Sequence, residues 1–396
     1  MKNNATVAPC KSGRLLALDI MRGITIAGML LVNNPGSWGD IYAPLRHADW
    51  NGLTPTDLVF PFFMFIMGVS AFFSMRKYDF KLSWNALAKV ARRTVLLFAI
   101  GLALAWFGLF VRGIFTGKTL WDAVMNFGDI RILGVIPRLA LCYGIGTVVA
   151  LAVPRRSLPW LIFAMLAVYA LVLLLGRGYE ESADNIIAIV DVSILGENHM
   201  YTSWFGGEPV KFDPEGLLST LPSVAHMLIG YLCGSLISRT KDNTQRISSL
   251  FIVGTILTFA GFLLSYGLPI NKKVWSPTFV LTTCGLAASL LALLIWIIDI
   301  RGHKRWCRFF EAFGINPLFL YCFGTMLAIL IGRLPVSWSG AESGEISITG
   351  FLYQAVCMPV CGDIPVLASL MYAVLFVLFC WCVGYILYKK KIYIKI

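Results

Sequence analysis

The sequence predicts an all-α, polytopic integral membrane protein with about ten transmembrane helices and both termini on the cytoplasmic side. Of its 396 residues, 58% are hydrophobic and only 14% are charged, whereas soluble domains carry about 25% charged residues. The mean hydropathy is +0.76. A soluble domain of this size could not bury so much apolar surface, so lipid must solvate most of the chain. A soluble enzyme, a disordered chain and a secreted disulfide scaffold are excluded.

Ten apolar runs come close to the roughly 17–25 residues that a helix needs to cross a bilayer. They are uniformly apolar rather than alternating, which favours helices over barrel strands. The first run contains Asp19 and Arg22 and has no cleavage site, so we interpret it as a retained helix and not a signal peptide. We expect one transmembrane domain at 15–388, with cytoplasmic tails at 1–14 and 389–396. The runs fall near 15–33, 58–75, 94–112, 132–153, 159–175, 217–238, 250–268, 277–299, 313–332 and 366–388.

The distribution of basic residues predicts the orientation. Alternate loops hold 22 Lys and Arg on the side of both termini and 9 on the other side, which also carries 16 of the 21 acidic residues. Cytoplasmic loops are the ones enriched in Lys and Arg, so both termini should be cytoplasmic. This asymmetry also explains the net charge of +12, and we expect no nucleic-acid partner. The long loops 176–216 and 333–365 should face outward and are long enough to be functional.

Polar groups within apolar runs are costly and need a reason. Asp19 and Arg22 lie three residues apart on one helix face and can pair, either as a structural pair or as the lining of a polar cavity. Asn33 closes the same helix at its outer end. Arg131 and Arg138 begin the fourth run, and Arg138 needs a partner there, either Asp19 or an anionic ligand such as a phosphate.

Histidine is the commonest acid–base group near neutral pH, and the chain has four. His303 lies in a basic loop and His226 within the sixth run, so both have ordinary structural explanations. His47 opens the segment HADWNGLTPTDLVFPFFMFIMG in an outer loop. Asp49 or Asp57 could hold its ring in the tautomer that a general base or a nucleophile requires.

Cysteines do not suggest a metal site, because none of the ten shows zinc-ligand spacing. Cys357 and Cys361 could form a strained disulfide or remain two free thiols. No nucleotide-binding or hydrolase motif occurs either. On residues alone, a transporter and a membrane-embedded enzyme are about equally supported, and a scaffold protein less so.

Five segments in order resemble the catalytic region of the heparan-α-glucosaminide N-acetyltransferase family and its bacterial relatives. They cover most of the chain between about residues 14 and 330. The segment that begins at His47 is the most specific of them. Two departures are a longer stretch between Asn33 and His47, and YCFGT at 321–325. The matching segments are RLLALDIMRGITIAGMLLVNN with HADWNGLTPTDLVFPFFMFIMG, RILGVIPRLALCYG, LGENHMY, FDPEGLLSTLPS and FGINPLFLY.

This resemblance implies an acyltransferase that moves an acetyl group from cytoplasmic acetyl-CoA to the amine of a glucosamine-type sugar at the outer face of a bacterial inner membrane. A sugar or amino-sugar permease and an O-acyltransferase of envelope glycans remain alternative functions. A homodimer is a possible oligomeric state. Acetyl-CoA, a glycan acceptor and the bilayer are the expected partners, without a metal. The resemblance implies catalytic roles for His47 and Asn33, which Asp57 would assist. We expect Arg22, Arg131, Arg138 and Asn316 to bind the donor, and Trp50, Asn51, His199, Asp213 and Glu215 to bind the acceptor.

Overall fold

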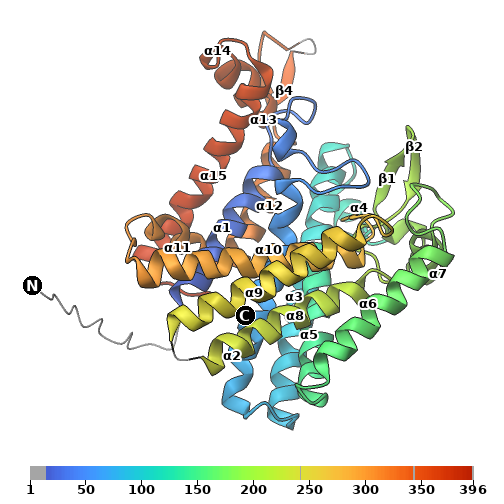
Figure 1. Ribbon diagram of the computed structural model, residues 1–396. Coiled ribbons are helices and arrows are strands. Elements are labelled where there is room, and N and C mark those ends of the chain that lie inside the picture. Colours follow the sequence, from blue (N-terminus) through green and yellow to red (C-terminus); the bar gives the residue numbers. More distant parts are fainter. Residues whose placement is uncertain (1–14, 241, 342–343, 395–396) are drawn as a thin grey trace, which may run out of the picture.

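A computed structural model describes residues 15–240, 242–341 and 344–394. The predicted all-α class is confirmed, and each predicted apolar run overlaps a helix of the structure (Figure 1). The predicted N-terminal tail lies outside the described residues, as do the last two residues of the C-terminal tail. The long helices are α1 Leu16–Val32, α2 Val59–Met75, α3 Trp84–Phe115, α5 Val135–Ala152, α6 Leu158–Leu175, α8 Thr220–Arg239, α9 Asn243–Leu264, α10 Pro277–Ile295, α12 Pro317–Ile331 and α15 Pro365–Lys389.

Shorter elements connect the long helices. Two antiparallel hairpins lie in the two long loops that we expect to face outward. The short helices are α4 Leu120–Val124, α7 Ile186–Leu195, α11 Cys307–Ile315, α13 Ile348–Phe351 and α14 Met358–Val360; the hairpins pair β1 Thr202–Phe205 with β2 Glu208–Lys211 and β3 Pro335–Ser337 with β4 Glu345–Ser347.

The number of helices long enough to span a bilayer is lower than the predicted ten. Among the described residues, eight qualify by length and composition, or nine if the bent pair α11 and α12 forms one span. The pair bends by 83° at Asn316, because Pro317 cannot donate a backbone hydrogen bond and disfavours a helical residue before it. Helix α1 has 17 residues, at the short end of the roughly 17–25 residues that cross a bilayer.

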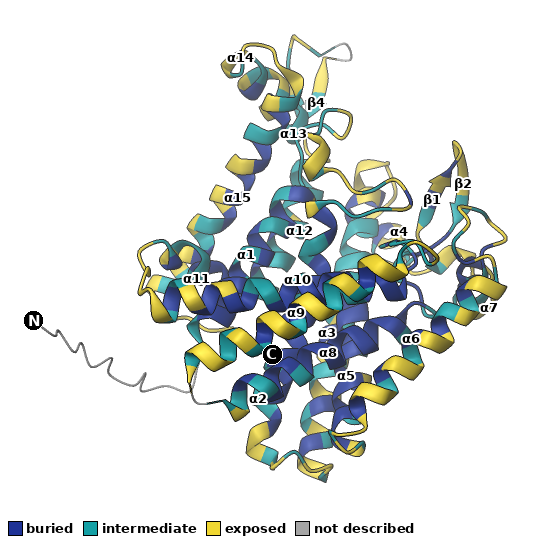
Figure 2. Ribbon diagram, in the orientation of Figure 1, coloured by how far each residue is buried: buried dark blue, intermediate teal, exposed yellow. Residues whose placement is uncertain are grey.

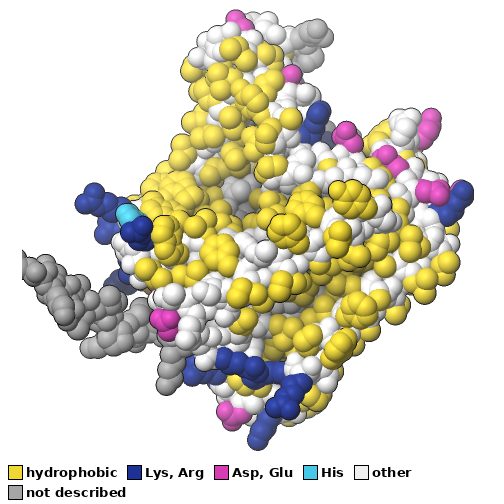
Figure 3. Space-filling model, viewed as in Figure 1, with side chains coloured by type: hydrophobic (Ala, Val, Ile, Leu, Met, Phe, Trp, Pro, Cys, Tyr) yellow, Lys and Arg dark blue, Asp and Glu magenta, His cyan; other side chains and the backbone are white. Residues whose placement is uncertain are grey.

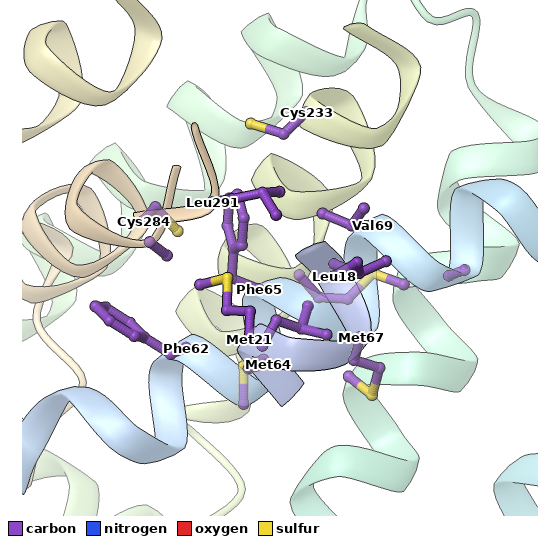
Figure 4. Packing of buried hydrophobic residues seen from close by; sticks show 14 of the residues in the cluster. Leu18, Met21, Phe62, Met64, Phe65, Met67, Val69, Cys233, Cys284 and Leu291 are labelled. Atoms are coloured by element: carbon purple, nitrogen blue, oxygen red, sulfur yellow. The ribbon is translucent and has the colours of Figure 1, made fainter. Parts of the chain in front are cut away.

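The helices form an inner group and an outer group. In the most apolar stretch of α8, 83% is buried within the protein, against 17% of the corresponding stretches of α3 and α9. Figure 2 shows the same contrast between the buried helices at the centre and the exposed faces of α6 and α9. Figure 4 shows where α1, α2, α8 and α10 meet, with Met21, Phe65, Cys233 and Leu291 around one apolar core. The loops that carry the polar residues therefore rest on a closely packed centre.

Helices α2 and α8 touch through their backbones. A Cβ atom on Gly68 would overlap the Met227 carbonyl oxygen, and one on Gly230 would overlap the Phe65 carbonyl oxygen. Such close approach needs residues without a side chain. It fixes α2, and hence the loop before it, relative to α8.

The surface carries an apolar belt with charges at its margins. In the view of Figure 3, hydrophobic side chains cover the helices, Lys and Arg gather mainly along the lower and left edges, and Asp and Glu gather mainly at the upper right. This agrees with an integral membrane protein. In the loop at 333–365, Cys357 and Cys361 are both free thiols, so the disulfide that we considered is not formed.

The orientation of the chain can be tested by labelling single cysteines with a membrane-impermeant maleimide in intact cells. Asp184 and Arg305 are both exposed and lie in loops that we expect on opposite sides. Asp184→Cys should react from outside, and Arg305→Cys should react only after the cells are opened. Labelling of Arg305→Cys alone in intact cells would reverse the predicted orientation.

The backbone contact between α2 and α8 predicts a steep response to a single methyl group. Gly230→Ala should lower the free energy of unfolding by about 1–3 kcal/mol, the usual cost of overpacking, because the methyl group meets the Phe65 backbone. Gly267→Ala is the matched control, since nothing lies within 4 Å of its added Cβ. Equal melting temperatures of the two purified variants would contradict the prediction.

Candidate active site

His47 and Asp57 form a hydrogen-bonded pair at the surface of the protein. The His47 Nδ1 atom lies 2.7 Å from Asp57 Oδ1, so Nδ1–H donates to the carboxylate. The His47 side chain is 43% exposed, whereas that of Asp57 is 1% exposed. This arrangement fixes the tautomer of the ring and leaves Nε2 free to accept a proton or to attack an acyl group.

The second oxygen of Asp57 holds the carboxylate in place. Asp57 Oδ2 accepts hydrogen bonds from Ala48 N at 3.2 Å, Thr54 N at 3.1 Å and Thr54 Oγ1 at 3.0 Å. Thr54 and Asp57 make a capping box around the short turn Pro55–Leu58, which leads directly into α2. The sequence pattern Thr-Pro-Thr-Asp thus both starts a helix and aims a carboxylate back at His47.

Lys272 is a third member of the site, and the sequence analysis missed it. Its Nζ atom lies 3.1 Å from His47 Nδ1 and 3.3 Å from Asp57 Oδ1. Burial lowers the pKa of Lys272, and the carboxylates of Asp57 and Glu215 oppose that shift. One signal was present in the sequence: two adjacent lysines, Lys272 and Lys273, stand in the set of loops that we expect to face outward, where basic residues are otherwise scarce.

The loop between α9 and α10 delivers Lys272 because it is bound to the His47 loop. Gly52 N donates to Ile270 O at 2.7 Å, and Asn271 Nδ2 donates to Asn51 Oδ1 at 3.2 Å. Trp275 follows in the left-handed region, with a φ of 51°, and its side chain is buried in the core. The loop is therefore held from both sides.

Trp50 does not present an exposed ring on which a sugar could stack. Its indole is buried, donates from Nε1 to Tyr179 O at 2.8 Å, and packs against Phe205 and Phe212 with ring centroids 5.4 and 5.6 Å away. It anchors the β1–β2 hairpin beside the His47 loop. Acceptor binding by Trp50 or Asn51 stays a prediction, and Asn51 is the exposed one of the two.

Arg131 is engaged by two residues that we expected to bind the acceptor. Its guanidinium contacts Asp213 through Nε at 2.9 Å and Nη2 at 2.5 Å, and Glu215 at 2.6 Å. Asp213 is fully buried. Burial alone would raise the pKa of Glu215, but Arg131 and Arg138 outweigh it and hold the pKa below its usual range. The three side chains form an ion-pair cluster, and their predicted ligand contacts stay predictions.

Arg138 is fully buried and holds the same segment of the chain. It donates to Gly216 O at 2.7 Å, to Ser223 Oγ at 3.1 Å and to Ser219 Oγ. The pairing of Arg138 with Asp19 that we considered is wrong, because Arg138 lies against α8. Asp19 instead pairs with Arg22 at 2.8 Å, which confirms the predicted pairing within α1.

The remaining predicted residues lie apart from this site. His199 Nδ1 contacts Ile130 O at 2.8 Å. Asn316, which is buried, donates to Ile392 O at 2.9 Å and accepts from Ile394 N at 2.8 Å, so it ties down the C-terminal segment. Asn33 is exposed at the end of α1, and no described hydrogen bond joins it to His47. Donor binding by Asn316 and catalysis by Asn33 stay predictions that this geometry does not support.

A metal site is not evident in the part of the chain that the structure describes. Within it, no three His, Cys, Asp or Glu side chains are grouped closely enough to hold an ion. The chemistry available at His47 is that of an oriented imidazole, a carboxylate and an ammonium group.

The chain is similar to known acetyltransferases. The family described as "Heparan-alpha-glucosaminide N-acetyltransferase, catalytic" matches residues 14–268. The mouse heparan-alpha-glucosaminide N-acetyltransferase is 29% identical over an alignment that covers 97% of this chain and 61% of the mouse protein. The human protein of that name is 29% identical, with 78% of this chain and 52% of the human protein covered. The chain thus spans between half and two thirds of the length of these relatives.

Asp191, in α7, is a buried carboxyl group that supports the segment held by Arg138. Its Oδ1 accepts from Leu218 N at 3.0 Å, while its Oδ2 has no hydrogen-bond partner among the described residues. Burial raises the pKa of Asp191 to about 6, and the Leu218 N–H opposes the shift. A proton on Oδ2 therefore stabilises the folded state.

This raised pKa predicts how stability changes with pH. The folded pKa lies above the ordinary value of 3.8, so the stabilisation is complete below that value and is lost as the pH rises through about 6. The melting temperature of the wild type minus that of Asp191→Asn should therefore increase between pH 7.5 and pH 5. Asp184→Asn, at an exposed site, should give no such trend. A difference for Asp191→Asn that does not change with pH would contradict the prediction.

Proposed function

Because the chain belongs to the heparan-alpha-glucosaminide N-acetyltransferase catalytic family, we propose that it is a transmembrane N-acetyltransferase. It transfers an acetyl group from acetyl-CoA to the amine of a glucosamine-type sugar. The observation that carries this proposal is the exposed His47 ring, oriented by buried Asp57, within the region that the family matches. The curated relatives are named for the same acetyl transfer.

His47 can act as a general base at Nε2. The acceptor reaches the site as an ammonium ion, whose proton passes to Nε2 before or during attack on the thioester. The amine nitrogen forms a bond to the acetyl carbon and releases its second proton to solvent, the bond from that carbon to sulfur breaks, and the thiolate leaves. The proton on Nε2 then protonates the thiolate, so the products are the N-acetyl sugar, free coenzyme A and one released proton. Asp57 keeps the ring aligned throughout.

A covalent route uses the same atoms. Nε2 forms a bond to the acetyl carbon, the bond from that carbon to sulfur breaks, and the coenzyme A thiolate leaves. The acceptor, which has lost its ammonium proton to solvent, then attacks the acetyl carbon as an amine, the bond from that carbon to Nε2 breaks, and the amine nitrogen gives up its second proton. Asp57 would receive the hydrogen bond of Nδ1–H in both routes. Both explain the free Nε2, and both require the donor and the acceptor to reach the Nε2 edge of the ring.

The solvent exposure of the four residues expected to bind the donor separates them into two accessible and two buried ones. The Arg22 and Arg131 side chains are 18% and 30% exposed, so each side chain keeps some surface at which a phosphate could bind. Arg138 and Asn316 are buried and hydrogen-bonded within the protein. We propose that the donor enters from the cytoplasm and that His47 faces the outer side of a bacterial inner membrane, because basic residues concentrate in the opposite set of loops.

Loss of His47 should remove turnover while the protein still folds. With radiolabelled acetyl-CoA and glucosamine, His47→Ala should lower kcat by at least about 10²–10⁴-fold, because no other imidazole lies at the site. Asp57→Asn should also reduce kcat, since an amide cannot stabilise the charged ring. His303→Ala, in an exposed loop, is the control and should retain wild-type turnover.

Two results would contradict the proposal. His47→Ala that keeps a tenth of wild-type turnover would remove His47 from the reaction. Uptake of glucosamine into vesicles without acetyl transfer would favour the permease alternative, and acetylation of a hydroxyl acceptor alone would favour the O-acyltransferase.

A further inference from the structure

Asp57 Oδ1 is shared by two cationic or potentially cationic groups. His47 Nδ1 lies 2.7 Å from it and Lys272 Nζ 3.3 Å from it, while the two nitrogens lie 3.1 Å apart. Since Nδ1–H donates to the carboxylate, Nδ1 has no lone pair for Lys272. The Lys272 ammonium therefore donates to Oδ1 and stands beside the imidazole as a neighbouring positive charge.

Protonation of His47 at Nε2 would place two full cations around one carboxylate oxygen. Asp57 Oδ2 cannot relieve this, because it already accepts three hydrogen bonds. Like charges at this separation disfavour the second charge. Glu215 is the other carboxylate that acts on Lys272, from the segment before α8. Arg46 and Asp49 are exposed on the His47 loop, and no described ion pair involves them.

We propose that Lys272 is a positioning residue. It keeps the His47 imidazole neutral and aligned at pH values at which the imidazole of a His–Asp pair alone would be protonated. The inference rests on the proposed function for its consequence in catalysis, since a neutral Nε2 is what both routes of acetyl transfer require. The contact itself is independent of the substrate.

The surrounding structure favours a dedicated position for Lys272. The loop that carries it is bound to Asn51 and Gly52 on the His47 loop. The next residue, Lys273, is directed elsewhere: its Nζ lies 5.5 Å from the centroid of the Trp50 ring. The two adjacent lysines thus have different partners, and of the two only Lys272 contacts the His47–Asp57 pair.

The test is the pH dependence of His47 modification by diethyl pyrocarbonate, which reacts with the neutral imidazole. The rate at His47 is followed by peptide mass spectrometry in purified protein without substrate, with exposed His303 as the standard in the same digest. The midpoint is the pH at which His47 reacts at half its maximal rate. In Lys272→Met this midpoint should move up by about one pH unit. Well below both midpoints, His47 should then react about tenfold more slowly than in the wild type.

Two further variants separate charge from structure. Lys272→Arg keeps the charge and should retain a midpoint close to that of the wild type, and Lys273→Met should leave the midpoint unchanged. The proposal is overturned if Lys272→Met has the wild-type midpoint, or if Lys273→Met moves it as far. Because this assay uses no acetyl-CoA, its outcome is independent of whether the protein transfers acetyl groups. In an active protein, the acidic limb of the kcat/KM profile should move in the same direction.

Discussion

The carboxylate of Asp57 joins the His47 loop and the turn before α2 to the loop between α9 and α10, which is distant in the sequence. Its two oxygens accept hydrogen bonds from His47, Ala48 and Thr54 and form an ion pair with Lys272. The same group therefore closes the turn that starts α2, orients the imidazole and receives the α9–α10 loop. A buried carboxylate is stable only when its lone pairs are satisfied. The geometry of the candidate site and the start of a core helix thus depend on a single ionised group.

A second group of contacts governs the other side of the site. Arg131 and Arg138 both bind the short segment that leads into α8, the first through Asp213 and Glu215 and the second through serines and a carbonyl. An arginine in an apolar run suggests a ligand when only the sequence is known, because a charge there is costly. Here part of that cost is offset by hydrogen bonds that position an outer loop over the core.

The sequence predicts well those features that depend on nearby residues. Apolar length indicated the helices, spacing of three residues paired Asp19 with Arg22, and a carboxylate ten residues from His47 proved to be its partner. It could not predict Lys272, which lies 225 residues from His47, since only the contact of the α9–α10 loop with the His47 loop brings them together. Nor could it predict the partners of Arg138, because serine hydroxyls and a backbone carbonyl have no charge by which to recognise them.

The direct backbone contact between α2 and α8 limits where a small molecule could pass between the helices. Gly68 and Gly230 leave no room between these helices for even a methyl group, so no extended ligand chain can pass between them at this contact. Helices α2 and α8 are therefore packed as one unit. Any passage toward His47 has to follow another boundary between helices, such as those of the sparsely buried outer helices α3, α6 and α9.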